Sequence, residues 1–395
     1  MAALRRRRAT GLLLAVAVGA GTALVGVQDS DQVTPGRPVA APSSAPATSS
    51  APAPTVVRPA PPEPVDACAD VIRTLPPRRR LAQLLVVGVD PGSVRSATRV
   101  VAEHGVGGIF VGGNDTALLV GDALVAVRET ATVPLSVAVD EEGGRVQRID
   151  ALDGDLPSAR VMARTMTVDQ VRAMARERGT NLRARGVTVD FAPVLDVTTQ
   201  PDDDVVGDRS FGSDPAVVAR YATAFALGLA DAGVRPVVKH FPGHGRATGD
   251  SHVTAVSTPP LAELRKVDLL PYRALLGSAP VAVMVGHLTV PGLTDGLPAT
   301  LSPATYRLLR TNLNFDGVVM TDDLGGMRAV SASYPLPRAV LTALTAGADI
   351  ALWSTGARYT GEVLDVLEKA LASGRLPPAR VDEALHRVLR ARGAC

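Results

Sequence analysis

The sequence has little net charge and few aromatic residues. The 395-residue chain carries a formal charge of +2, and residues 1–65 hold six arginines against three acidic residues, so residues 66–395 are close to neutral. Aromatic residues make up 3% of the chain. Nucleic-acid binding needs a basic surface, so this composition excludes nucleic acid as an expected partner. The 46% hydrophobic content is ample for a full core.

The N-terminal segment lacks a cysteine after its apolar run. Four arginines, Arg5 to Arg8, precede an almost purely apolar stretch at residues 11–27. A basic flank followed by a short apolar run is typical of an export signal, and this run is at the lower limit of length for a membrane anchor. No cysteine follows it, which argues against lipid modification. We therefore expect residues 1–27 to be a signal peptide or membrane anchor, and the protein to be secreted or tethered outside the cytoplasmic membrane.

Residues 28–65 have few charges and no periodic pattern. They are rich in Pro, Ala and Ser, which have too little to bury to offset the cost of ordering, so we expect a disordered linker. The folded domain is then residues 66–395. Its two cysteines, Cys68 and Cys395, lie at its two ends. In an oxidising compartment we expect them to form a disulfide; two free thiols are the alternative.

The folded part alternates short apolar runs with longer amphipathic segments. Runs rich in Val and Ile lie at residues 84–90, 106–113, 135–140, 187–197, 234–241, 281–288, 317–323 and 349–354. Helical patterns lie at residues 168–185, 215–232, 261–276, 338–346, 361–373 and 378–392. Continuous apolar runs indicate parallel strands covered on both faces. Eight such repeats predict an α/β fold, a single (β/α)8 TIM barrel, with a doubly wound open sheet as the alternative.

Ionisable residues stand where five consecutive runs stop. These strand ends are Asp140, Asp196, the Lys239–His240 pair, His287 and the Asp322–Asp323 pair. In a TIM barrel the chemistry occurs at the carboxyl ends of the strands. The five ends therefore predict one polar site at the barrel mouth. His287 either contacts substrate there or only forms hydrogen bonds within the mouth.

Three of the six histidines fall within residues 237–252. Asp250 lies two residues before His252, and on an extended segment that spacing places both on one side. The carboxylate would then fix the imidazole tautomer and make His252 a general acid/base. We expect Gly243, Gly245 and Gly249 to give this loop the mobility to close over a substrate. His244 has no assigned role.

The same histidine cluster also offers plausible zinc ligands. His240, His244, Asp250 and His252 are residue types that bind zinc. Metal-dependent barrel hydrolases of the amidohydrolase kind have a His-x-His after the first strand, and here residues 88–90 are Gly-Val-Asp. We therefore expect no metal and no other cofactor.

A carboxylate at a strand tip followed by glycines is a suitable nucleophile. Asp322 and Asp323 precede Gly325-Gly326, so one of the pair is expected to attack and the other to orient it. Asp140 begins an Asp-Glu-Glu-Gly-Gly-Arg run that could bind a polyhydroxylated ligand. Arg209, between Asp208 and Ser210 in a glycine-flanked loop, is suited to fork onto a hydroxyl or carboxyl group, although a surface arginine is the simpler interpretation.

These motifs together resemble those of a known family. Lys-His-Phe-Pro-Gly-His-Gly at 239–245, followed by Asp-Ser-His at 250–252, is similar to glycoside hydrolase family 3, in its single-domain bacterial β-N-acetylglucosaminidase (β-hexosaminidase) branch. The Thr-Asp-Asp-Leu at 321–324 resembles the family's nucleophile signature, with Asn312 departing from its usual residues. The segments 140–148, 207–212 and 298–302 also match.

The resemblance implies a role for each candidate residue. Asp322 would be the nucleophile that forms a covalent glycosyl-enzyme intermediate, His252 the general acid/base, and Asp250 its orienting partner. Four residues would hold the sugar hydroxyls, namely Asp140, Arg209, Lys239 and His240.

The implied activity is a retaining exo-β-N-acetylglucosaminidase. It would act on N-acetylglucosamine-containing cell-wall fragments (muropeptides) or chitin-type oligosaccharides, with the protein a monomer. A β-glucosidase on the same barrel is an alternative. So is a phosphorylase, because a histidine acid/base does not repel phosphate as a carboxylate would. An alternative of another class is a non-catalytic wall-binding protein.

Overall fold

A computed structural model describes residues 67–395 of the chain. The predicted signal or anchor at residues 1–27 and the predicted linker at residues 28–65 lie outside the described residues. Within residues 67–395, no helix combines the length and apolarity needed to cross a membrane.

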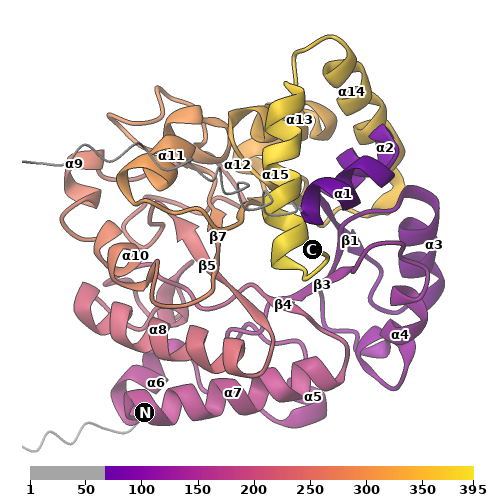
Figure 1. Ribbon diagram of the computed structural model, residues 1–395. Helices are drawn as coiled ribbons and strands as arrows, with labels where there is room; N and C mark the ends of the chain where they lie inside the picture. Colours follow the sequence, from indigo (N-terminus) through magenta and orange to yellow (C-terminus); the bar gives the residue numbers. More distant parts are fainter. Residues whose placement is uncertain (1–66) are drawn as a thin grey trace, which may run out of the picture. The chain divides into compact units, whose positions relative to one another are not determined.

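Eight parallel strands form a closed barrel, which confirms the (β/α)8 prediction and excludes the open sheet (Figure 1). The strands are β1 Leu85–Val89, β2 Gly108–Val111, β3 Ser136–Val139, β4 Val189–Asp190, β5 Arg235–Phe241, β7 Ala282–Val285, β9 Val319–Asp323 and β10 Ile350–Trp353. Each pairs in parallel with its neighbour, and β10 closes the barrel onto β1. A separate two-stranded parallel pair, β6 Val256–Ser257 and β8 Leu288–Thr289, lies outside the barrel.

Helices surround the barrel and bury its apolar strands. The α-helices are α1 Ala67–Thr74, α2 Pro77–Ala82, α3 Val94–His104, α4 Ala123–Arg128, α5 Asp150–Asp153, α6 Ala159–Thr165, α7 Val168–Ala184, α8 Pro215–Asp231, α9 Leu261–Leu264, α10 Leu269–Leu275, α11 Pro303–Arg307, α12 Arg328–Ser331, α13 Leu336–Ala346, α14 Thr360–Ala372 and α15 Pro378–Ala391. Short 3-10 or π-helical turns are η1 Ala117–Leu119, η2 Gly207–Arg209, η3 Ala299–Leu301, η4 Leu308–Asn312 and η5 Ala357–Tyr359. Strands β1, β3 and β7 are buried at every residue, as continuous apolarity predicts.

Two elements are shorter than the sequence pattern predicts. The run at 187–197 contains only the two-residue strand β4, and beyond it the buried chain continues without strand pairing except at Val194. Pro193 falls in that stretch and cannot donate to a ladder. The helix expected at 261–276 is split into α9 and α10. Pro271 sits in the first turn of α10, where its missing N–H costs nothing, whereas a continuous helix would place it in the interior.

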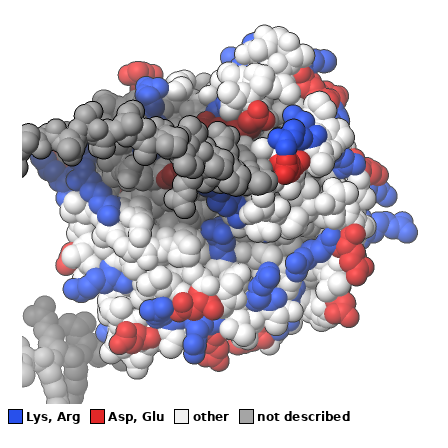
Figure 2. Space-filling model, viewed as in Figure 1, with Lys and Arg blue, Asp and Glu red and all other residues white. Residues whose placement is uncertain are grey.

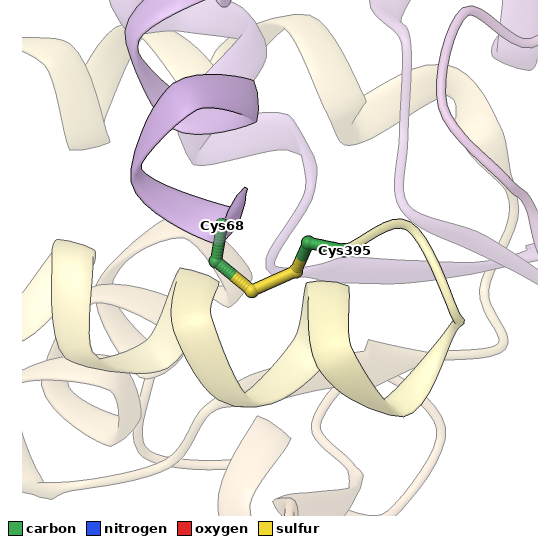
Figure 3. Close-up of a disulfide and its surroundings, with 2 residues drawn as sticks. All are labelled: Cys68 and Cys395. Carbon is green, nitrogen blue, oxygen red and sulfur yellow. A yellow bond between two sulfur atoms is a disulfide. The ribbon is translucent and has the colours of Figure 1, made fainter. Parts of the chain in front are cut away.

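A disulfide joins the two ends of the described chain (Figure 3). Cys68 in α1 is bonded to Cys395, which follows α15, with a Cα–Cα separation of 5.0 Å. The predicted pairing is confirmed. Because 327 residues separate the two cysteines, the bond links the first helix of the barrel domain to the last.

The visible surface carries mixed charge. In Figure 2, basic and acidic side chains alternate over the described part of the face, with no extended field of one sign. This agrees with a folded part close to neutrality.

Candidate active site

The main cavity opens at the carboxyl ends of the barrel strands. Its volume is about 950 Å³, which exceeds the needs of a single sugar ring. Seven of the eight predicted site residues line it, and these are Asp140, Arg209, Lys239, His240, Asp250, His252 and Asp322. Apolar walls are contributed by Phe110, Phe191 and Met284. The topology therefore brings together residues from the ends of β3, β5 and β9 and from the loops that follow β4 and β5.

The two adjacent carboxylates at the end of β9 have different surroundings. Asp323 accepts hydrogen bonds from the backbone N–H groups of Gly325, Gly326 and Ser354, each at 2.9 Å, and from the Ser354 hydroxyl. Both of its oxygens are therefore already hydrogen-bonded, to the turn after β9 and to Ser354 after β10. Among the described residues, the Asp322 carboxylate accepts a hydrogen bond only from the N–H of Asp323, at 2.8 Å. Of the pair, Asp322 is the carboxylate available to a ligand.

Asp322 is held in its ionised form. Burial alone would raise its pKa, but the nearby imidazoles of His240 and His287, the Asp323 N–H and Lys239 outweigh that effect and lower the pKa below 3.8. Hydrogen bonds and positive charge favour the anion. A buried anion with oxygen atoms facing a cavity is the form that a nucleophile requires.

His287 lies behind this carboxylate and does not line the cavity. Its Nε2 donates to the carbonyl oxygen of Asp323 at 2.9 Å, which leaves Nδ1 to accept from the Thr300 hydroxyl at 2.8 Å. Burial lowers its pKa. Both ring nitrogens are occupied by protein partners, which favours the second interpretation of His287, namely hydrogen bonds within the barrel mouth. It supports the turn that positions Asp322.

A buried cluster of alternating charge forms one wall of the cavity. The Lys239 ammonium lies 2.7 Å from Asp140 and 2.6 Å from Glu142. Arg209 forks onto Glu142 with two hydrogen bonds of 2.8 and 2.7 Å. Glu142, for which the sequence suggested no individual role, therefore holds both cations in place.

The charges in this cluster stabilise one another. Burial would raise the pKa of Glu142, but Arg209 and Lys239 lower it far below its usual value. Burial would lower the pKa of Lys239, but Asp140 and Glu142 raise it. Glu142 and Lys239 are thus charged, and the remaining donor and acceptor positions of the cluster can serve a polyhydroxylated ligand.

Asp196 holds His240 and His244 in place through hydrogen bonds. It is fully buried and accepts a 2.7 Å hydrogen bond from His240 Nδ1 and a 2.6 Å bond from the backbone N–H of His244. Burial would raise its pKa, but His240 lowers it. With Nδ1 bound to Asp196, His240 has Nε2 left for the cavity. Asp196 was recognisable in the sequence only as a strand end.

The Asp250–His252 pair forms as expected, but through a turn rather than an extended segment. His252 Nδ1 lies 2.7 Å from Asp250 Oδ1, which also accepts the His252 backbone N–H at 2.9 Å. The carboxylate thus closes an Asx turn and orients the ring at the same time. The pKa of Asp250 is lowered because these bonds outweigh partial burial. The His252 side chain is 60% exposed, so its Nε2 is open to the cavity.

The residue between these two fixes the loop to the barrel. Ser251 is 1% exposed, and its hydroxyl lies 3.1 Å from Nε2 of buried His244. The carbonyl oxygens of Ser251 and His252 accept the backbone N–H groups of Ala329 and Arg328 at the start of α12, at 3.1 and 3.3 Å. His244, which had no predicted role, therefore holds the acid/base loop through Ser251.

Close packing, more than mobility, explains the glycines of this loop. A Cβ on Gly245 would lie 2.3 Å from the carbonyl oxygen of Val197. Gly243 has a φ of 132°, and a Cβ there would lie 2.5 Å from the side chain of Asp268. Asp268 in turn binds Arg246 of the same loop with bonds of 3.0 and 2.6 Å. Both glycines therefore allow the loop backbone to pack closely against the barrel mouth, where a side chain would clash.

The described residues contain no group of three or more His, Cys, Asp or Glu side chains arranged to hold a metal ion.

Known proteins are similar to this chain in sequence and in fold. The sequence profile described as "Glycosyl hydrolase family 3 N terminal domain" matches residues 77–391. The protein named beta-hexosaminidase LpqI of Mycobacterium tuberculosis is 54% identical over 333 residues, which are 82% of this chain and 85% of that protein.

Solved structures agree with the sequence comparison. A glycosyl hydrolase of the same family from Mycobacterium smegmatis is similar with a TM-score of 0.79 at 54% identity, covering 82% of this chain and 98% of that one. A family 3 β-N-acetylglucosaminidase from Paenibacillus is similar with a TM-score of 0.76 at 32% identity, covering 81% and 63%. The chain belongs to glycoside hydrolase family 3.

Proposed function

We propose that the protein is a retaining exo-β-N-acetylglucosaminidase. The observation that carries this proposal is the placement of an ionised carboxylate, Asp322, in one cavity with a carboxylate-oriented imidazole, His252. The first can attack an anomeric carbon and the second can protonate a leaving oxygen. The relatives named beta-hexosaminidase and β-N-acetylglucosaminidase support the sugar assignment.

The mechanism proceeds in two displacement steps. In the first, an Asp322 oxygen forms a bond to C1 as the glycosidic bond breaks, and Nε2 of protonated His252 gives its proton to the departing oxygen. In the second, neutral His252 takes a proton from water, whose oxygen attacks C1 and releases Asp322. The two inversions give net retention. Asp250 keeps Nδ1 protonated and stabilises the imidazolium before each donation.

The charged wall holds the sugar. Lys239 and Arg209 can donate to ring hydroxyls while Asp140 accepts from them, and His240 Nε2 faces the same space. Their mutual ion pairs set the directions of these groups before substrate arrives, so little ordering is needed on binding.

The proposed substrates are cell-wall-derived or chitin-derived fragments that end in β-linked N-acetylglucosamine. We propose that the protein is exported, with residues 1–27 as a signal or anchor, residues 28–65 as a linker, and residues 66–395 as one catalytic domain that acts as a monomer. The Cys68–Cys395 disulfide supports an oxidising location.

A comparison of two aryl substrates tests the proposal. The purified protein should hydrolyse an aryl N-acetyl-β-glucosaminide much faster than the matching aryl β-glucoside. The Asp322→Ala variant should lose activity by orders of magnitude without loss of fold. A preference for the glucoside would instead indicate a β-glucosidase, and no turnover of either would favour a non-catalytic wall-binding protein.

Sugar transfer to phosphate is a second candidate for the same site. It is favoured by the acid/base being an imidazole, which does not repel an anionic acceptor. Phosphorolysis predicts a faster reaction with added phosphate and release of N-acetylglucosamine 1-phosphate. An unchanged rate and free N-acetylglucosamine as the product would leave hydrolysis alone.

A further inference from the structure

A second cavity lies at the opposite end of the barrel. This basal hollow has a volume of about 290 Å³ and is formed by the starts of the strands, including Ser136, Val189, Arg235 and Ala282. Strand β5 runs from Arg235 at this end to His240 at the active site. At about 3.3 Å per residue, these two residues are about 16 Å apart. The basal hollow is therefore separate from the catalytic cavity.

Four arginines line the basal hollow without a carboxylate. They are Arg128, Arg183, Arg235 and Arg392, and none of the described residues that line the hollow is Asp or Glu. The other lining residues are mostly apolar. A small cavity is thus lined by four positively charged side chains in a domain whose net charge is close to zero.

Within the described residues, the two half-buried arginines of the hollow, Arg235 and Arg392, donate only to uncharged oxygens. Half-buried Arg235 donates to the carbonyl oxygens of Ala391 at 2.7 Å and Pro280 at 3.4 Å. Half-buried Arg392 donates to the side-chain and backbone oxygens of Gln83. Burial lowers the pKa of Arg235, and that of Arg392 to about 10, with no acidic group opposing the effect in either case. Burial therefore disfavours their charge, and no carboxylate compensates for it.

Many other buried or half-buried arginines of the described residues are paired with carboxylates. Arg178 contacts Glu141, Arg246 contacts Asp268, and Arg310 shares Asp349 with Arg380. Outside the basal hollow, half-buried Arg79 and Arg80 donate to backbone carbonyl oxygens without an ion pair in the described structure. An unpaired half-buried guanidinium is costly, and the basal hollow holds two of them in one cavity. Each has donor capacity left, because a guanidinium has five N–H groups.

Helix ends offset this charge only in part. Arg128 ends α4, Arg183 lies in the last turn of α7, and Arg392 caps α15, so all three benefit from the negative end of a helix dipole. Each helix terminus is equivalent to only about half a charge. Arg128 and Arg183 are also exposed and make no hydrogen bond or ion pair within the described part of the chain.

We propose that the basal hollow is a binding site for the phosphate group of a small organic phosphate ester such as glycerol phosphate. A tetrahedral anion can accept hydrogen bonds from several guanidinium groups at once, so it suits a cavity lined by four arginines better than a single carboxylate would. The apolar lining residues can accommodate the carbon skeleton. The phosphate is supplied either by a free ester or by a lipid headgroup.

Calorimetric titration of the full-length protein with glycerol 3-phosphate, and with inorganic phosphate, tests the site. Saturable binding is expected, and it should weaken at least tenfold in Arg235→Gln. The rim variant Arg128→Gln/Arg183→Gln should show a similar loss even if Arg235→Gln fails to fold. The control Arg220→Gln removes an exposed arginine of α8 that does not line the hollow and should bind as the wild type does.

Vesicles distinguish the source of the phosphate. Cosedimentation with phosphatidylglycerol vesicles, but not with phosphatidylcholine vesicles, that is lost in the rim variant would assign a lipid headgroup. Binding of the soluble ester alone would assign a free ester. The proposal is overturned if no saturable binding occurs, or if binding is equal in the wild type and in the arginine variants, as it would be for phosphate held in the catalytic cavity. Hydrolysis of an aryl glycoside should be unchanged in the rim variant.

Discussion

Replacing Ser251 with alanine should impair proton donation while leaving the nucleophile intact. The Ser251 hydroxyl binds Nε2 of His244, both residues are buried, and the other ring nitrogen of His244 has no partner within the described structure. The variant thus removes the side-chain hydrogen bond that fixes the residue between Asp250 and His252. Asp322 lies on a different strand and keeps all its contacts.

The size of the effect follows from the cost of an unsatisfied buried group. Losing this bond costs about 1–3 kcal/mol, which corresponds to about 5- to 150-fold in the fraction of molecules with the loop in place. The backbone bonds from Ala329 and Arg328 remain. We therefore expect a loss in the lower part of this range, about 5- to 30-fold in kcat/KM.

A series of aryl N-acetyl-β-glucosaminides provides the assay. The full loss in kcat/KM is expected for a methoxyphenyl glycoside, because its leaving oxygen must be protonated as the bond breaks. The loss should almost vanish for a dinitrophenyl glycoside, whose leaving group departs without protonation. The His252→Ala variant should show the same trend more strongly. Ser136→Ala, at the base of the barrel, is the control and should be neutral toward catalysis. An equal loss for all leaving groups, or no loss, would refute the role of Ser251.

Three further predictions concern stability. Glu142→Gln leaves Lys239 and Arg209 poorly compensated, so the free energy of unfolding in urea should fall by about 3–5 kcal/mol; a change below 1 kcal/mol would contradict the charge cluster. Burial raises the pKa of Asp190 well above 3.8, so the folded protein holds a proton that the unfolded chain loses as the pH rises through 3.8. The stability of Asp190→Asn relative to the wild type should therefore increase with pH from about 4 upward, and a constant difference in melting temperature would exclude this. Cys395→Ser should cost about 2–5 kcal/mol, and a reductant should lower the melting temperature of the wild type but not of this variant.

The barrel could be predicted because its signals are local and repeated. Each strand is a short run of Val and Ile buried on both faces, and the polar residues at the run ends mark the catalytic mouth. The two misjudged elements depend on single prolines, Pro193 and Pro271, whose effects depend on their position within an element. An apolar or amphipathic pattern does not reveal that position.

The sequence indicated most of the residues that form the site, but not the hydrogen bonds that join them. Nothing in the pattern distinguishes Asp322 from Asp323, because the difference lies in the backbone N–H groups that the following turn directs at Asp323. The two interpretations of His287 stayed open for a similar reason: its partners, Thr300 and the Asp323 carbonyl, come from two other segments. Tertiary hydrogen bonds decide which polar residues face the ligand.

The central claim is that Asp322 captures the sugar, and covalent trapping tests it most directly. A fluorinated N-acetylglucosaminyl donor with a good leaving group should slow the second step and leave the sugar attached, so that peptide mapping by mass spectrometry finds the label on Asp322. Asp322→Ala should acquire no label. A label on Asp323, or full inactivation without any covalent sugar, would contradict the account.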